Sequence, residues 1–178
     1  MHTVLSRLNT VFAFTLSVLA ATTFLCFLTT SFNSNFSPSN LQAGRVLIKN
    51  VPDFTGDRDR NDLALLTFDL KANLTDVFNW NVKELFLYVM AEYSSPNNVR
   101  NQVFLWDKIL LRDENGVLEY KDMNTDYYFF DDGLGLKSNK NISLSLYWQI
   151  IPNAGQTPRI RSVSQLVEFP DRYTAIKQ

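Results

Sequence analysis

Histidine is almost absent from this chain of 178 residues, and its scarcity argues against several kinds of active site. The single histidine, His2, precedes a long apolar segment. The chain beyond that segment therefore offers no Ser–His–Asp triad, no Cys–His pair and no histidine-bound metal. A Ser–Lys dyad is compatible with the composition, but no spacing singles one out. An enzyme that acts alone is therefore the weakest interpretation of the sequence.

Cysteine and surplus positive charge are also scarce. The only cysteine, Cys26, lies inside the apolar segment, so a domain on the far side of a membrane would have no disulfide. Such a domain must rely on core packing, for which 14 Phe, 7 Tyr and 3 Trp supply large side chains. With 17 Lys and Arg against 18 Asp and Glu, and no basic stripe, nucleic acid is a poor candidate partner.

Residues 11–30, VFAFTLSVLAATTFLCFLTT, contain no charged side chain. Twenty helical residues span about 30 Å, the thickness of the hydrocarbon core of a bilayer. A cleaved signal peptide is the alternative, with a cleavage site after Val18–Leu19–Ala20. However, the apolar run continues through TFLCFL, beyond the usual length of a signal-peptide core. The pattern favours an uncleaved transmembrane signal anchor.

The charges that flank this segment predict its orientation. Arg7 precedes it, and the next positive residue, Arg45, follows well beyond it. The positive-inside rule then places residues 1–10 in the cytosol and everything after the span in the lumen. Residues 31–44, rich in Ser and Asn, are expected to form a short linker, and residues 45–178 are expected to form one lumenal domain.

Strand patterns dominate the predicted lumenal domain. In residues 142–150, ISLSLYWQI, apolar and polar side chains alternate with the period of a half-buried strand. Residues 101–112 show a similar pattern whose phase slips near Trp106–Asp107, which suggests a bulge. Asn115-Gly116 predicts the type I′ turn of a hairpin. About eight short strands predict an all-β fold, an antiparallel β-sandwich preceded by a single transmembrane helix.

Two segments allow both a structural and a functional interpretation. Residues 83–93, KELFLYVMAEY, are apolar on both faces, as in a strand covered by core on both sides or in a strand that contacts a partner. Residues 127–136, YYFFDDGLGL, contain Asp131–Asp132 ahead of a glycine. The carboxylates could bind Ca²⁺ or take part in catalysis, but Asp-Gly is typical of a tight turn. We predict a turn here, and no catalytic, cofactor-binding or metal-binding residue in the chain.

Three Asn-x-Ser/Thr sequons follow the predicted span, at Asn35, Asn73 and Asn141. Asn141 lies in a polar loop ahead of a strand and is predicted to carry a glycan. Asn73 ends a strand on its polar face and is a second candidate. Asn35 is expected to lie too close to the bilayer to be modified.

Most of the chain consists of long, distinctive segments, namely MHTVLSRLNTVFAFTLSVLAA, VLIKNVPDFTGDRDRNDLALLTFDL, FNWNVKELFLYVMAEY, NQVFLWDKIL and YYFFDDGLGLKSNKNISLSLYWQIIPNAG. These segments resemble the signal peptidase complex subunit 3 family. The linker at 31–43 and the tail after 157 contribute little to the resemblance. The chain has Leu134 where the family usually has Asn, which affects the turn after Asp132.

The resemblance implies an accessory subunit, because in that family the serine-protease chemistry belongs to a separate catalytic subunit. It further implies a single-pass type II glycoprotein of the endoplasmic reticulum membrane, with its glycan on Asn141. Its partners would be the catalytic and the other accessory subunits of the signal peptidase complex. We expect a non-catalytic subunit that supports and positions the catalytic subunit for removal of signal peptides from nascent secretory proteins. A membrane-anchored lectin-like or adhesion β-sandwich is the alternative.

Overall fold

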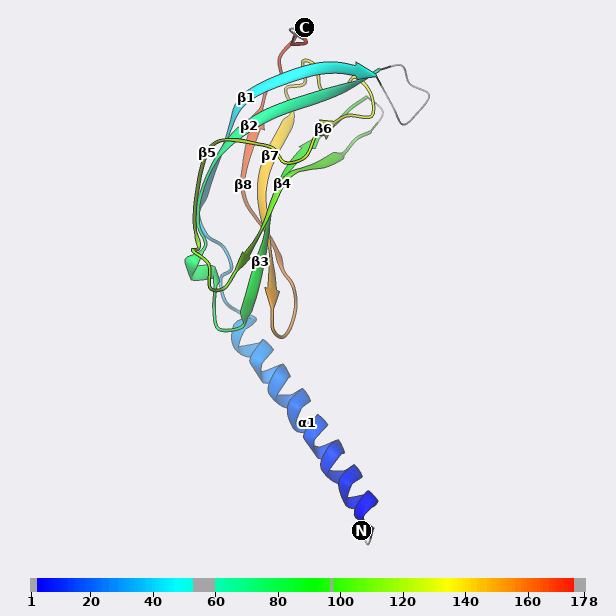
Figure 1. The fold of residues 1–178 in the computed structure, drawn as a ribbon, viewed down its shortest axis with the longest axis vertical. Coiled ribbons are helices and arrows are strands. Elements are labelled where there is room, and N and C mark those ends of the chain that lie inside the picture. The colour runs from blue at the N-terminus through cyan, green and yellow to red at the C-terminus, as the bar shows by residue number, and fades with distance from the viewer. Residues whose placement is uncertain (1–2, 53–59, 97, 175–178) are drawn as a thin grey trace.

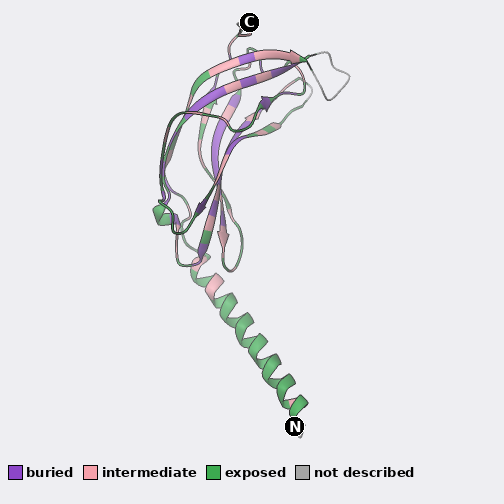
Figure 2. Ribbon diagram, viewed as in Figure 1, coloured by how far each residue is buried: buried purple, intermediate pink, exposed green. Residues whose placement is uncertain are grey.

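The computed structural model describes residues 3–52, 60–96 and 98–174. In these residues a long N-terminal helix is followed by two antiparallel sheets that pack face to face, and the helix projects away from one end of the sheets (Figure 1). The side chains between the sheets are buried, whereas those of the helix are almost all exposed (Figure 2). The structure confirms the predicted class, an all-β domain after a single apolar helix.

Helix α1, Val4–Thr30, is 27 residues long, strongly apolar and exposed along almost its whole length. It begins ahead of the predicted residue 11 because the hydroxyl of Thr3 caps it, accepting a hydrogen bond from the Ser6 amide at 3.2 Å. Within the span, hydroxyls bond back to carbonyls one turn earlier, as Thr15 does to Val11 at 2.8 Å. Among the described residues, α1 is the one helix long and apolar enough to cross a membrane.

The two sheets contain all eight strands of the described residues. One sheet has the order β1-β2-β5, with β6 also paired to β2, and the other has the order β4-β3-β7-β8. The strands are β1 (Ser39–Pro52), β2 (Arg60–Asn73), β3 (Val82–Tyr93), β4 (Asn101–Leu111), β5 (Val117–Asn124), β6 (Phe129–Phe130), β7 (Ile142–Pro152) and β8 (Arg159–Val167). A 3₁₀ turn, η1 (Thr75–Val77), lies in the connection between β2 and β3.

The first strand begins earlier than the sequence predicted. Residues 31–44 were expected to form a linker, but β1 starts at Ser39, and Leu41 is already in the core at 2% exposure. The strand bends at the register shift between Ala43 and Val46. The bend hides the period-two alternation that would have revealed the strand. The connection between helix and sandwich is therefore shorter than predicted.

The core lies between the inner faces of the two sheets, and β7 contributes much of it. Ile142, Leu144, Leu146, Trp148 and Ile150 point inward and are at most 3% exposed, as their alternation predicted. Other large side chains that meet them from neighbouring strands include Phe68, Trp106 and Phe129. The bulge expected at Trp106–Asp107 is present, since the pairing of β3 with β4 shifts between Trp106 and Phe104.

The predicted hairpin at Asn115-Gly116 is wrong. Strand β4 pairs with β3 in one sheet and β5 pairs with β2 in the other, so the segment crosses between sheets. Gly116 does not have the positive φ of a type I′ turn. It is required instead by a close approach, because a Cβ there would lie 2.8 Å from the Thr75 amide nitrogen. Its carbonyl also accepts a hydrogen bond from Leu74 at 2.8 Å.

The inward position of Trp148 leads to a stability prediction. Trp148→Ala should lower the free energy of unfolding by about 3–5 kcal/mol, because it leaves a large cavity in a core that has no disulfide. Leu166→Ala, on the neighbouring strand at 70% exposure, is the matched control and should cost less than about 0.5 kcal/mol. Urea unfolding of the full chain in detergent, followed by circular dichroism, would compare the two. Equal losses would contradict the assignment of Trp148 to the core.

Candidate functional site

The two adjacent carboxylates at Asp131 and Asp132 have different surroundings. Asp131 is buried at 2% exposure and accepts hydrogen bonds from the Tyr93 hydroxyl at 2.6 Å and the Gly135 amide at 2.7 Å. Asp132 is exposed and accepts one from the Asn98 side chain at 3.1 Å. Burial, and then the hydrogen bond to Asp131, raise the pKa of Tyr93, so its hydroxyl keeps its proton and donates. The pair lies in a loop as predicted, but Asp131 connects that loop to β3 rather than only forming a turn.

A second buried carboxylate holds the same loop from the other side. Asp62 on β2 is fully buried and accepts hydrogen bonds from the Leu136 amide at 3.2 Å, the Lys137 amide at 3.1 Å and the Tyr173 hydroxyl at 3.0 Å. Backbone amides and hydroxyls thus satisfy both carboxylates. No group of three or more metal-ligating side chains occurs in the part of the chain that the structure describes. The arrangement supports a structural role for these carboxylates.

Strand β3 divides its apolar side chains between the two faces of its sheet. Leu85, Leu87 and Val89 are completely buried in the core between the sheets. Phe86, Tyr88 and Met90 lie on the opposite face, where Tyr88 and Met90 form a small separate cluster with Tyr147 of β7. The strand is therefore covered on both faces, as the first interpretation predicted, because Tyr88 and Met90 are only 4% and 3% exposed. Contact of this face with a partner stays a prediction.

This outer face is covered by aromatic rings in fixed contact. Tyr88 stacks on Tyr147 with ring centroids 5.3 Å apart, and the Phe104 ring lies 5.0 Å from Tyr88. Phe104 is 50% exposed and Ile109, on the same edge strand, is 55% exposed. Rings that are already held by neighbours lose little side-chain freedom when a partner binds. The outer face of β4-β3-β7-β8 is therefore a candidate protein interface.

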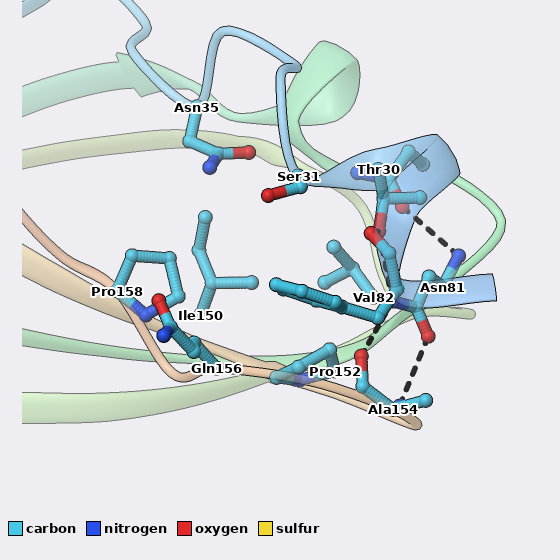
Figure 3. A pocket seen from close by; sticks show the side chains of 12 residues that line it. Thr30, Ser31, Asn35, Asn81, Val82, Ile150, Pro152, Ala154, Gln156 and Pro158 are labelled. Atoms are coloured by element: carbon cyan, nitrogen blue, oxygen red, sulfur yellow. Dashed lines mark hydrogen bonds between the residues drawn. The ribbon is translucent and has the colours of Figure 1, made fainter. Parts of the chain in front are cut away.

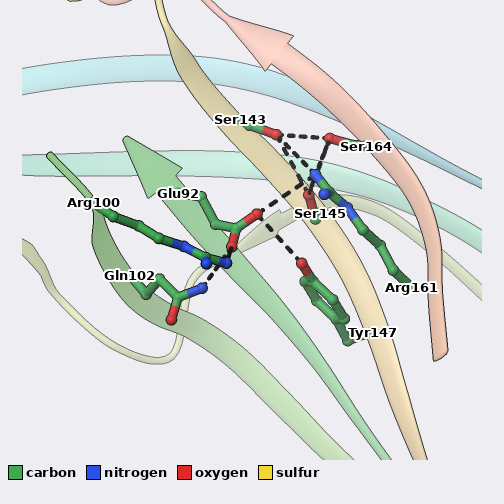
Figure 4. Close-up of polar contacts among 8 residues, drawn as sticks. All are labelled: Glu92, Arg100, Gln102, Ser143, Ser145, Tyr147, Arg161 and Ser164. Atoms are coloured by element: carbon green, nitrogen blue, oxygen red, sulfur yellow. Dashed lines mark hydrogen bonds and ion pairs between the residues drawn. The ribbon is translucent and has the colours of Figure 1, made fainter. Parts of the chain in front are cut away.

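A polar network borders these rings (Figure 4). The Glu92 carboxylate accepts hydrogen bonds from Arg100 at 2.9 Å, Gln102 at 2.6 Å and the Tyr147 hydroxyl at 3.3 Å, and it pairs with Arg161 at 3.5 Å. Partial burial opposes ionisation of Glu92, but the hydrogen bonds from Arg100 and Gln102 outweigh it and lower the pKa of this carboxyl.

The Arg161 guanidinium continues the network to three serine hydroxyls, those of Ser143, Ser145 and Ser164. Arg161 also lies over the Tyr147 ring. The polar border is thus fixed to the same aromatic cluster, and the two form one ordered surface.

The third notable region is the joint between α1 and the sandwich (Figure 3). Asn81, 3% exposed, donates from its side chain to the Thr30 hydroxyl at 3.0 Å and to the Ala154 carbonyl at 2.8 Å. Its side-chain oxygen accepts from the Ala154 amide at 3.1 Å. One amide therefore joins the last residue of the helix to the hairpin between β7 and β8.

An aromatic contact completes the joint. The Phe27 ring lies so close to Gly155 that a Cβ on this glycine would overlap it, and Gly155 also has a φ of +108°. The segment between the helix and β1 is also bound to the sandwich, because the Trp148 indole of β7 donates to the Asn35 carbonyl at 3.1 Å. Around the joint lies a small pocket of about 120 Å³ that no charged side chain lines. Sequence analysis missed this joint because nothing near Asn81 marks it as special.

The three sequons have distinct environments in the structure. Asn141 is exposed immediately before β7, and Asn73 is exposed at the end of β2. Asn35 is half-buried beside the joint, and the hydroxyl of its sequon residue Ser37 is buried and donates to the Asn73 carbonyl. In the folded chain Asn141 and Asn73 are thus both exposed, whereas Asn35 is less accessible, and the use of each sequon stays a prediction.

The fold and these contacts define a membrane-anchored β-sandwich with one helix and an ordered outer sheet face. The chain belongs to the signal peptidase subunit family, whose family model matches residues 1–172. It is 54% identical to the human signal peptidase complex subunit 3 over 178 residues, which covers 99% of both chains. It is 56% identical to the subunit 3 protein of Drosophila melanogaster over 174 residues, which covers 97% of both.

A further relative carries a different name. The mouse protein called adipocyte-related X-chromosome expressed sequence 1 is 53% identical over 174 residues and covers 97% of both chains. Membership of the family confirms the resemblance to signal peptidase subunits, and it agrees with the expectation of a non-catalytic subunit of a protease complex.

The buried setting of Asp131 leads to a second stability prediction. Asp131→Asn should lower the free energy of unfolding by about 1–3 kcal/mol, because an amide cannot accept both hydrogen bonds that the carboxylate accepts. Asp132→Asn is the matched control on the exposed neighbour and should cost less than about 0.5 kcal/mol. Urea titration of tryptophan fluorescence in the full chain would measure both. An Asp131→Asn variant as stable as the control would disprove the structural role.

The sequons lead to a third prediction. In cells, Asn141→Gln should remove an endoglycosidase-sensitive shift on gels, because Asn141 is exposed and lies beyond the membrane helix. Asn35→Gln is the control and should leave the shift unchanged. Asn73→Gln should remove a second shift if that site is also modified. A chain with no sensitive shift at all would contradict the predicted lumenal position of the sandwich.

Proposed function

We propose that this chain is a non-catalytic subunit of the signal peptidase complex that supports and positions the catalytic serine-protease subunit. In this proposal α1 crosses the endoplasmic reticulum membrane once, with the N-terminus in the cytosol and the sandwich in the lumen. The complex removes signal peptides from nascent secretory proteins, and its catalytic and other accessory subunits are the partners. Family membership favours this role over a lectin-like or adhesion module.

The observation that carries the proposal is the joint at Asn81. A sandwich on a flexible linker of the predicted length could move over roughly 20 Å relative to the membrane. In the structure, the end of the helix is instead bonded to Asn81, and Phe27 packs against the β7–β8 hairpin. These contacts restrict both the distance and the direction of the sandwich relative to the helix. A sandwich whose position relative to the helix is restricted can hold a neighbouring active site at a constant height above the bilayer.

The outer face of β4-β3-β7-β8 gives a second argument for the proposal. A positioning subunit needs a surface that does not reorganise when its partner binds. The stacked rings of Tyr88 and Tyr147, 4% and 6% exposed, and the bonded Glu92 hold the side chains of this face in place. The exposed apolar side chains of Phe104 and Ile109 supply area that a partner could bury. We therefore assign the catalytic subunit or another subunit of the complex to this face.

The joint leads to a fourth prediction, on activity. In the assembled complex, Thr30→Val should lower the rate of signal-peptide cleavage by about fivefold, if the loss of about 1 kcal/mol for the Asn81 hydrogen bond appears fully in the barrier. Gly155→Ala should have a larger effect, because the new methyl group forces Phe27 away and the backbone has a positive φ. Cleavage of a model precursor by purified complex would measure both.

The matched control is Thr29→Val on the same turn of α1. Thr29 is exposed, and its hydroxyl bonds only locally, to the Cys26 carbonyl at 2.8 Å, so its replacement should leave cleavage unchanged. Thr30 and Gly155 variants that assemble normally and cleave at the normal rate would refute the positioning role. That result would leave membership of the family untouched.

A further inference from the structure

We propose that the base of the sandwich rests in the lipid interface of the bilayer, with Trp80 and Phe32 as its aromatic anchors. The partner is the lipid surface itself, on whichever side of the membrane the sandwich lies. The inference requires α1 to span the membrane, but it requires neither a positioning role nor contact with another subunit.

Both anchors expose large aromatic surfaces beside the end of α1. Phe32 is 89% exposed and Trp80 is 54% exposed, whereas the other two tryptophans, Trp106 and Trp148, are at most 2% exposed. A surface that exposes aromatic rings next to a membrane helix differs from the rest of a water-soluble face. Tryptophan and other aromatic residues are enriched at the boundary between hydrocarbon and water, where a ring can be half in each medium.

The apolar part of the helix, residues 11–30, places this boundary at its last turn. The uncharged residues 11–30 account for about 30 Å, the thickness of the hydrocarbon core, so the core ends near Thr30. Phe32 follows two residues later and can lie at most about 7 Å further along the chain. It is therefore held within the headgroup layer unless the helix is displaced from the bilayer.

The joint brings Trp80 to the same level. Its neighbour Asn81 is hydrogen-bonded to Thr30 at 3.0 Å, so the loop ahead of β3 lies against the end of the helix, as Figure 1 also shows. The backbone of Gly155 reaches Phe27, one turn before the end of the helix. The base of the sandwich is thus at or slightly below the level of Thr30, where lipid headgroups surround it.

The other groups near Trp80 suit this environment. The Arg112 guanidinium donates to the Trp80 carbonyl at 3.2 Å and to the Val82 carbonyl at 2.8 Å, so a cation is fixed beside the anchor at the depth of lipid phosphates. The pocket at the joint is lined without charged side chains, so headgroups can cover it at little electrostatic cost. Because aromatic contact dominates, zwitterionic lipid should be sufficient.

Contact between the base of the sandwich and the lipid would fix the tilt of α1, which the helix alone leaves undetermined. A single membrane helix can tilt over a wide range, about 0–40° from the bilayer normal. A second point of contact to one side of the helix axis selects one tilt, since any other tilt lifts Trp80 out of the interface or buries it in hydrocarbon.

Lipid-dependent quenching of tryptophan fluorescence tests the proposal directly. The full chain is reconstituted into phosphatidylcholine vesicles with and without brominated acyl chains, and Trp80→Phe is compared with the unchanged chain. We expect brominated lipid to quench the unchanged chain and Trp80→Phe to lose most of this quenching, because Trp106 and Trp148 are buried in the sandwich. We also expect Trp80 to be shielded from acrylamide in vesicles.

The opposite pattern would overturn the proposal: Trp80 quenched by acrylamide in the aqueous phase and not by brominated lipid. This experiment contains no catalytic subunit, so its failure is distinct from a failure of the positioning role, which the cleavage assay of the Thr30 and Gly155 variants measures.

A second measurement examines the assembled complex. A photoreactive amino acid at position 80 should form adducts with phospholipid, detected by mass spectrometry. The same amino acid at position 134, in an exposed loop remote from the helix, should form none. Crosslinking of position 80 to another subunit in place of lipid would refute contact between Trp80 and lipid in the complex.

Discussion

The contact between Asn81 and the end of the membrane helix is the constraint on which the geometry of this subunit depends. A single buried amide satisfies the Thr30 hydroxyl and both backbone groups of Ala154. It therefore joins a transmembrane helix, the loop before β3 and the β7–β8 hairpin at one point. The ring of Phe27 against Gly155 adds a second contact at another position on the helix, so the joint resists rotation as well as separation.

The sheet β4-β3-β7-β8 serves two purposes because its two faces carry different kinds of side chain. The inner face closes a core without disulfides, and the outer face presents stacked rings beside the bonded Glu92. The joint fixes where this outer face lies relative to α1. A partner on this face would therefore meet a surface defined in both composition and position, which is what a supporting subunit of a membrane protease requires.

Regularly repeating local patterns allowed much of the fold to be predicted. A run of twenty uncharged residues is long enough to cross a bilayer, and the alternation from Ile142 to Ile150 can bury one face only as a strand. The phase slip near Trp106 likewise marked the bulge in β4. These features follow from the geometry of consecutive residues, so the sequence by itself determined them, as it determined membership of the family.

Contacts between residues far apart in the sequence decided the features that local patterns do not predict. The sequence predicts a loop at Asp131, but the hydrogen bond of Asp131 to Tyr93 joins residues 38 positions apart. Asn115-Gly116 suggests a hairpin from its local sequence, because the crowding of Gly116 against Thr75 arises only when β5 pairs with β2. Asn81 carries no local signal, since its partners Thr30 and Ala154 are 51 and 73 positions away. Local sequence determines which elements form, whereas the joint between them exists only after packing brings its side chains together.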